Sequence, residues 1–153
     1  MAEKTLIIIK PDGMQRHLAG RIITRFEQKG LKLVAAKLIK VPEKLSSELY
    51  TVHKGKAFYE GLVKYLSSTP VLLTVWEAEG VIEITRKMLG ATFGYDAQPG
   101  TIRGDFSCSK GYNIVHGSDS TDSAQREINI FFKPQEILEY ELADENWLYG
   151  KNE

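Results

Sequence analysis

The sequence predicts one α/β domain, an α+β sandwich of ferredoxin-like βαββαβ topology, in which helices pack on a four-stranded antiparallel sheet. Three observations support this class. Short apolar runs typical of strands alternate with segments of helical periodicity along the chain. The length of 153 residues, 42% of them hydrophobic, suffices for one core. We find no repeat, low-complexity segment or linker, so we expect residues 1–153 to form a single domain.

The first part of the chain predicts a strand, a helix and a second strand. Residues 5–9 are a run of β-branched and apolar side chains that ends at Lys-Pro-Asp-Gly, residues 10–13, which we interpret as a turn. Residues 21–29 place apolar side chains at helical spacing before a glycine, which indicates a helix. Residues 31–41 are rich in Leu, Val and Ile and precede Pro42, so we expect the second strand there.

The middle of the chain predicts a helical pair, a strand and another helix. Residues 43–52 and 57–67 each carry apolar side chains on one helical face. Residues 70–76 form a third apolar strand. Residues 81–88 repeat apolar side chains at i, i+3 and i+7, which predicts a helix that ends at Gly90.

The last third contains a long loop, the fourth strand and two helices. Residues 91–109 are interrupted by Gly and Pro, and loops of this length in a compact domain tend to be functional. Residues 112–116 predict the fourth strand, and residues 123–131 the next helix. Because proline suits the first turn of a helix, Pro134 favours a final helix over residues 135–141.

Composition narrows the functional class. Lys plus Arg and Asp plus Glu both number 20, so no basic surplus indicates a nucleic-acid partner, and we expect no specific nucleic acid. The single cysteine, Cys108, excludes an intrachain disulfide framework. No apolar run reaches the roughly 20 residues that a membrane helix needs. The N-terminus also lacks the apolar core of a signal peptide, so we expect a cytoplasmic protein without membrane contact.

Several active-site motifs are missing from the sequence. It contains no GxxxxGK[ST] phosphate loop and no GxGxxG dinucleotide fingerprint. Its three histidines never fall at HExxH spacing, and one cysteine cannot build a zinc site. No GxSxG motif surrounds Ser118 or Ser120. These absences argue against P-loop, Rossmann, zinc and serine-hydrolase chemistry.

His116 follows an apolar run and precedes Gly-Ser-Asp-Ser, which places an imidazole among polar groups that need hydrogen-bond partners if buried. Judged by spacing alone, a structural histidine at a strand end, with its hydrogen bonds satisfied, is more frequent than a catalytic one. Arginine forks and a lysine charge suit phosphate oxygens, so the dispersed Lys10, Arg86, Thr92 and Arg103 favour polyphosphate binding. His116 would then be the nucleophile. Glu127 is a candidate to fix its tautomer.

These residues lie within blocks that together resemble the nucleoside diphosphate kinase family along nearly the whole chain. Blocks in this order, at compatible spacings, are far more specific than a histidine motif alone. The blocks are IKPDG (residues 9–13), RFEQKG (25–30), GLVKY (61–65), PGTIRGDF (99–106) and NxxHGSDS (113–120).

The resemblance implies a ping-pong transfer of the γ-phosphoryl group from a nucleoside triphosphate to a nucleoside diphosphate, through a phosphohistidine at His116. It implies phosphate contacts from Arg86, Thr92 and Arg103, and contacts of Lys10 and Asn113 with the ribose hydroxyl and nearby phosphate oxygens. Tyr50 would neighbour the transferred group, Phe58 would stack on the base, and Ser118 and Glu127 would orient the histidine. The implied cofactor is Mg²⁺ held by the nucleotide phosphates, with Asp119 as a water-mediated contact.

Two features bear on assembly and on rival functions. Common family members carry Asn-Pro in the long loop, where this chain has Phe93-Gly94-Tyr95, which puts the stability of subunit contacts in doubt. The tail, residues 147–153, resembles that of hexameric rather than tetrameric members, so we expect a homo-hexamer, with a tetramer as the alternative. The rival function is an interaction or nucleic-acid-binding protein that retains the fold, and phosphohistidine donation to other proteins would use the same residues. We interpret His17, His53 and Cys108 as incidental.

Overall fold

A four-stranded antiparallel sheet organises the protein in the computed structural model, which describes residues 2–153. Its strands are β1 (Ala2–Ile9), β2 (Lys32–Ile39), β3 (Val71–Glu79) and β4 (Val115–Gly117), in the spatial order β2-β3-β1-β4. β1 pairs antiparallel with both β3 and β4, and β2 pairs antiparallel with β3. The predicted α+β, ferredoxin-like class is confirmed.

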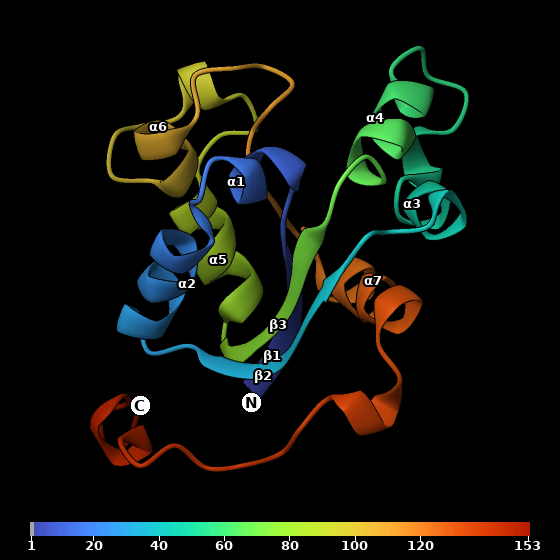
Figure 1. Cartoon of the computed structure of the whole chain (residues 1–153). Helices are drawn as coiled ribbons and strands as arrows, with labels where there is room; N and C mark the ends of the chain where they lie inside the picture. Colours follow the sequence, from blue (N-terminus) through green and yellow to red (C-terminus); the bar gives the residue numbers. More distant parts are fainter. Residues whose placement is uncertain (1) are drawn as a thin grey trace.

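Helices cover both faces of the sheet (Figure 1). α2 (Ala19–Gln28) and α5 (Val81–Leu89) lie on one face, and α7 (Thr121–Phe131) lies on the other. α3 (Glu43–Leu49) and α4 (Tyr59–Leu66) form a pair near one end of the sheet, on the side of α7.

The apolar run of β1 explains why the sheet is covered twice. Side chains alternate along a strand, so Leu6 and Ile8 enter the core under α3, α4 and α7, whereas Ile7 and Ile9 enter the core under α2 and α5. All four are essentially inaccessible to solvent. Each fully buried side chain of this size contributes roughly 1.5–3 kcal/mol relative to an exposed one, so β1 is the central apolar element of the fold.

Two short helices occupy segments that the sequence did not predict as helical. The expected turn at residues 10–13 opens α1 (Pro11–Gln15), with proline at its first position, where its missing N–H costs no helical hydrogen bond. The expected long loop contains the 3₁₀ turn η2 (Gly94–Asp96) and α6 (Ile102–Phe106). The hydroxyl of Thr101 caps α6 by accepting a hydrogen bond from the Gly104 amide at 3.0 Å.

The expected final helix over residues 135–141 is wrong. Only the single 3₁₀ turn η3 (Pro134–Glu136) forms there, and the chain then runs along the edge of β2. The Leu138 amide donates to the Val34 carbonyl at 2.9 Å, and the Lys32 ammonium donates to the Tyr140 carbonyl at 2.7 Å. Contacts with the open sheet edge thus replace the hydrogen bonds of the expected helix. A further 3₁₀ turn, η4 (Glu145–Trp147), follows.

Within residues 2–153, no helix combines the length and the apolar character that crossing a membrane requires.

Candidate active site

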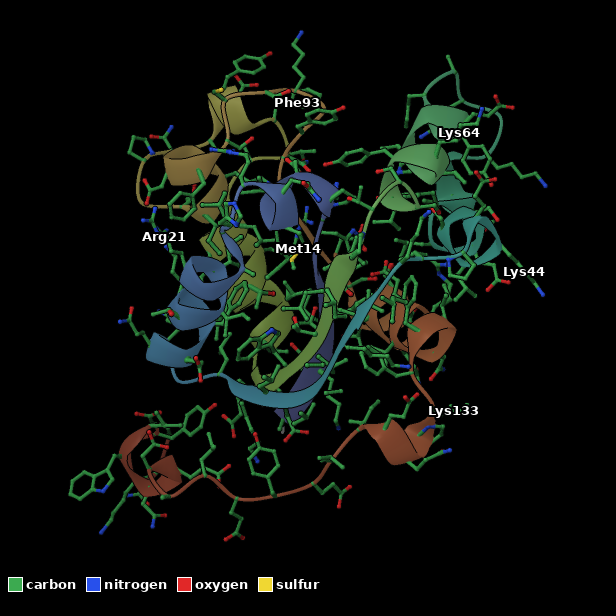
Figure 2. The ribbon with its side chains drawn as sticks, viewed as in Figure 1. Met14, Arg21, Lys44, Lys64, Phe93 and Lys133 are labelled. Carbon is green, nitrogen blue, oxygen red and sulfur yellow. The ribbon has the colours of Figure 1, made fainter. Side chains whose placement is uncertain are left out.

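A cleft of about 640 Å³ opens between the α3–α4 pair and the segment that follows α5. In Figure 2, Phe93 marks the loop side of this cleft and Lys64 marks α4 on the other side. The cleft brings together all of the sequence-predicted site residues except Ser118, which lies behind it: Lys10, Tyr50, Phe58, Arg86, Thr92, Arg103, Asn113, His116, Asp119 and Glu127.

His116 enters the cleft from β4, the short edge strand paired with β1. Its Nε2 lies 2.7 Å from Oε1 of Glu127, which is buried on α7. Because a carboxylate only accepts hydrogen bonds, Nε2 carries the hydrogen in this contact. The lone pair of the neutral ring is then on Nδ1, the nitrogen left for a ligand.

Ser118 is linked to His116 through Glu127. Its hydroxyl donates to the same Oε1 atom at 2.9 Å and accepts from the Leu6 amide at 3.3 Å. The Ser118 side chain is fully buried, and both of its contacts are fixed by β1 and α7. Ser118 therefore restricts the carboxylate, and the carboxylate restricts the imidazole.

A chain of three residues runs along the wall beside His116. The Lys10 ammonium donates to Oδ1 of Asn113 at 2.9 Å, and Nδ2 of Asn113 donates to the Thr92 carbonyl at 2.8 Å. Burial and the nearby Arg103 charge lower the pKa of Lys10 to about 8, against an opposing effect of Asp12. Lys10 thus keeps most of its charge at neutral pH while two of its three N–H donors stay available.

Arg103 is held by backbone carbonyls more than by any side chain. Its Nε, Nη1 and Nη2 donate to the carbonyls of Asn113, Gly90 and Val115 at 3.3, 3.1 and 2.7 Å. A guanidinium has five N–H donors, so two remain for a ligand. Burial and the charge of Arg86 lower the pKa of Arg103 to about 10, which leaves it protonated at neutral pH.

Arg86 reaches the same cleft from α5. Its Nη1 donates to the Gly117 carbonyl at 3.2 Å, beside the histidine. Lys10, Arg86 and Arg103 therefore bring three positive charges into one cleft. A multiply charged anion is the ligand that such a cluster favours.

The chain turns sharply just before His116, where the sequence predicted that the fourth strand begins at residue 112. The Val115 amide donates to the Asn113 carbonyl at 2.7 Å, which is the hydrogen bond of a γ-turn, and Ile114 has a φ of +61°. A β-branched residue at positive φ is strained. β4 therefore begins only at Val115, and this strain is invisible to residue periodicity.

Aromatic side chains form the outer part of the cleft. The rings of Tyr50, His53 and Phe58 contact one another in series, with centroids 6.4 and 5.3 Å apart. Phe93 lines the opposite side and stacks on Tyr95. The sequence analysis predicts neither of these two aromatic residues, His53 and Phe93, as part of the site. The sequence signal for His53 is its position five residues before Phe58, the candidate stacking residue.

Two further polar groups of the cleft, the Tyr50 hydroxyl and the Asp119 carboxylate, have distinct properties. The Tyr50 hydroxyl is buried with no hydrogen-bond partner among residues 2–153, and burial and Glu127 raise its pKa, so it stays protonated. A hydrogen bond from Ser123 and the charge of Arg86 lower the pKa of Asp119. Nowhere in residues 2–153 do three or more His, Cys, Asp or Glu side chains gather into a group that could hold a metal.

Comparison with known proteins agrees with this geometry. Residues 3–137 match the family model of nucleoside diphosphate kinase. A nucleoside diphosphate kinase A from Canis lupus familiaris is 51% identical over 148 residues, which cover 97% of each chain. The nucleoside diphosphate kinase of Carboxydothermus hydrogenoformans is 50% identical over 147 residues, 96% of this chain and 99% of that protein.

Solved structures show the same similarity. A halophilic nucleoside diphosphate kinase from Halobacterium salinarum, in complex with CDP, superposes with a TM-score of 0.95 at 42% identity, over 98% of this chain and 100% of that one. A nucleoside-diphosphate kinase from Borrelia burgdorferi, a transition state mimic with bound vanadate and ADP, gives a TM-score of 0.89 at 43% identity, over 94% and 95% of the chains. The fold, the cleft and these relatives together show that the chain belongs to the nucleoside diphosphate kinase family of phosphotransferases.

Proposed function

We propose that the protein transfers the γ-phosphoryl group of a nucleoside triphosphate to a nucleoside diphosphate by a ping-pong mechanism, through a phosphohistidine at His116. The observation that carries the proposal is the Nε2 contact with Glu127, which leaves the Nδ1 lone pair as nucleophile inside a cleft of positive charge. We propose residues 1–153 as one catalytic domain.

In the first half-reaction, Nδ1 of His116 attacks the γ-phosphorus. The N–P bond forms as the bond to the bridging β,γ-oxygen breaks, and the nucleoside diphosphate leaves with those electrons. The imidazole gains positive charge in this step, and the Glu127 carboxylate at Nε2 stabilises it. In the second half-reaction, a terminal oxygen of another diphosphate attacks the phosphorus, the N–P bond breaks, and the neutral imidazole is restored.

Positive charges hold the phosphates during both halves. Phosphoryl transfer depends mainly on positioning and charge neutralisation. Arg86 and Arg103 keep free N–H donors for phosphate oxygens, together with Thr92. Lys10 and Asn113 lie one hydrogen bond apart and would reach the ribose hydroxyl and nearby phosphate oxygens.

Tyr50 and Phe58 would complete the substrate contacts. The Tyr50 hydroxyl is a buried donor that has no partner within the described part of the chain, and a phosphate oxygen would satisfy it. The Phe58 ring is half-exposed in the cleft, at 52%, and offers a face to the base. Stacking without hydrogen bonds to base edges tolerates every base.

The cleft suits a metal ion that arrives with the nucleotide. Asp119 offers a carboxylate near Arg86, and it would contact the ion through water. When bound, Mg²⁺ neutralises phosphate charge.

The proposals for the assembly and the location of the protein rest on its sequence. We propose a homo-hexamer rather than a tetramer, on the basis of the tail at residues 147–153. The 89% exposed indole of Trp147 gives this tail an apolar contact for a neighbouring subunit. Light scattering on the full chain would separate the two assemblies. A cytoplasmic location stays a prediction.

Labelling of the protein with γ-labelled ATP and Mg²⁺ tests the mechanism. We expect acid-labile label that a nucleoside diphosphate discharges, and no label on His116→Ala. The matched control is His17→Asn, because His17 lies outside the cleft at a positive φ that asparagine tolerates. Acid-stable label, or label on His116→Ala, would contradict the proposal.

A further inference from the structure

Asp12 links the α3–α4 wall of the cleft to the γ-turn that precedes the nucleophile, although it does not itself line the cleft. Its Oδ1 accepts a short hydrogen bond from the Tyr65 hydroxyl on α4, and its backbone amide donates to the same hydroxyl oxygen at 2.9 Å. Its Oδ2 accepts from the Ile114 amide at 3.0 Å. The two oxygens of one carboxylate thus contact two different elements.

The turn that Asp12 contacts needs support from outside. A strained backbone conformation costs about 1–3 kcal/mol and persists only when its surroundings hold it. Besides Asp12, the Lys10 amide donates to the Ile114 carbonyl at 2.9 Å. A Cβ atom at Gly13 would lie 2.8 Å from that carbonyl, so α1 approaches the turn as closely as only glycine permits.

The same turn positions several groups of the cleft at once. Asn113 contacts Lys10 with its side chain, and the carbonyls of Asn113 and Val115 both accept from Arg103. His116 follows one residue later. A shift of the turn would therefore displace the nucleophile and two phosphate-binding cations together.

Tyr65 is fixed in turn by its neighbours. Its ring stacks on that of Tyr112, with centroids 4.8 Å apart and planes at 15°. Tyr112 directly precedes the turn, so Tyr65 contacts this segment both through Asp12 and through a stacked ring. Two contacts of Tyr65, one through its hydroxyl and one through its ring, thereby join α4 to the segment of the γ-turn.

We propose that Asp12 and Tyr65 are positioning residues for the phosphorylation of His116, acting through the strained turn at Ile114. This proposal rests on the proposed function. In this proposal the Tyr65 hydroxyl on α4 helps to position His116 on β4. Neither Asp12 nor Tyr65 touches the substrate.

Asp12 also acts on the charge of Lys10. The groups that set the pKa of Lys10 are its own burial and Arg103, which lower it, and Asp12, which raises it. The titratable groups facing Asp12 itself are Tyr65 and, behind it, Tyr112. Removing the Asp12 charge would lower the Lys10 pKa further, whereas removing the Tyr65 hydroxyl would leave that charge in place.

The test compares Asp12→Asn and Tyr65→Phe with the matched control Tyr59→Phe. Tyr59 lies on the same helix and outside the cleft, and its hydroxyl makes one long contact, 3.4 Å, with the Ser47 carbonyl. Single-turnover labelling at saturating ATP gives the phosphorylation rate, and titration of ATP gives the apparent affinity. We expect both variants to lose about tenfold or more in rate with affinity within about threefold, because small misplacements of reacting groups are costly. Tyr59→Phe keeps the wild-type rate.

The pH profile of the half-saturating ATP concentration separates positioning from general loss of structure. Asp12→Asn should move its alkaline limb to lower pH, and Tyr65→Phe should not. Wild-type phosphorylation rates in Asp12→Asn and Tyr65→Phe, or rates that fall only with the folded fraction, would overturn this proposal. Should Asp12→Asn fail to fold, the rate of Tyr65→Phe decides. An unlabelled wild type would instead contradict the proposed function itself.

Discussion

The carboxylate of Glu127 lies 2.7 Å from Nε2 of His116, and this contact gives the two nitrogens of one ring different tasks. Nε2 is occupied by a buried anion, and Nδ1 is left for the substrate. The anion is itself restricted by Ser118 and by its place on α7. The histidine thus has one tautomer and one orientation before any nucleotide binds.

Replacing the Glu127 carboxylate by an amide tests whether its charge at Nε2 supports the reaction at Nδ1. Glu127→Gln keeps the size of the side chain but removes the charge that stabilises the phosphorylated ring. We expect kcat to fall roughly 10- to 1000-fold with little change in KM, because the lost interaction strengthens only in the transition state. Steady-state nucleotide transfer measures both, with the exposed Glu139→Gln as control. An unchanged kcat would show that the contact is only structural.

We expect the charged Lys10 side chain to lower the free energy of unfolding, although it supports activity. Its pKa of about 8 in the folded protein lies below the roughly 10.4 of an unfolded chain, so the unfolded state binds more protons between these values. The wild type should therefore gain stability as pH rises through this window, by at most about 1.4 kcal/mol per pH unit. Lys10→Met lacks this slope.

Chemical denaturation of both proteins at pH 8, 9 and 10 measures the difference. At pH 7 we expect Lys10→Met to lose about 100-fold in kcat, because one charged donor to the phosphates is gone. Parallel stability curves for the two proteins would refute the lowered pKa.

Arg103 should be essential to the fold of the site as well as to phosphate binding. In Arg103→Lys, one ammonium cannot reach the carbonyls of Asn113, Gly90 and Val115 together. Unpaired buried carbonyls cost about 1–3 kcal/mol each, so we expect a loss of roughly 2–4 kcal/mol and a Tm lower by about 10 °C. The exposed Arg21→Lys is the calorimetric control and should change Tm little.

Phe58 should affect binding alone. Loss of one base–aromatic stack costs about 1–3 kcal/mol, so Phe58→Ala should raise KM about 5- to 100-fold for purine and pyrimidine diphosphates alike, with kcat unchanged. Its ring is half-exposed, so Tm should hardly move. The KM of the companion variant Phe93→Ala shows how much the opposite side of the cleft contributes to binding. A rise in KM for one class of base only would show base-specific contacts instead.

The sequence predicted the sheet, the main helices and ten of the twenty residues that line the cleft. The strands were predictable because apolar runs such as residues 5–9 are buried on both faces, and the cleft residues because their motifs follow one another at recognisable spacings. The sequence predicts Glu127 as the group that orients His116, and the structure adds that the contact is made by Nε2.

Other features depend on neighbours that periodicity does not reveal. α1 and α6 have five residues each, too few to show a helical pattern. The segment after Pro134 contacts β2 through Leu138 and Tyr140, so the helix that this proline favours does not form there. Ile114, which has a positive φ, contacts Asp12 and Lys10, about a hundred positions away in sequence.

The pairing of β1 with β4 also has a consequence for biosynthesis. Ile8 faces His116 across this pair of strands, so the proposed nucleophile is positioned by pairing between the first strand and a strand synthesised about a hundred residues later. Contacts of such sequence separation form late, because closing a long loop is entropically costly. A nascent chain released short of β4 would carry Lys10 and Phe58 without a reactive imidazole. Phosphoryl transfer would therefore report that synthesis and folding have both gone to completion.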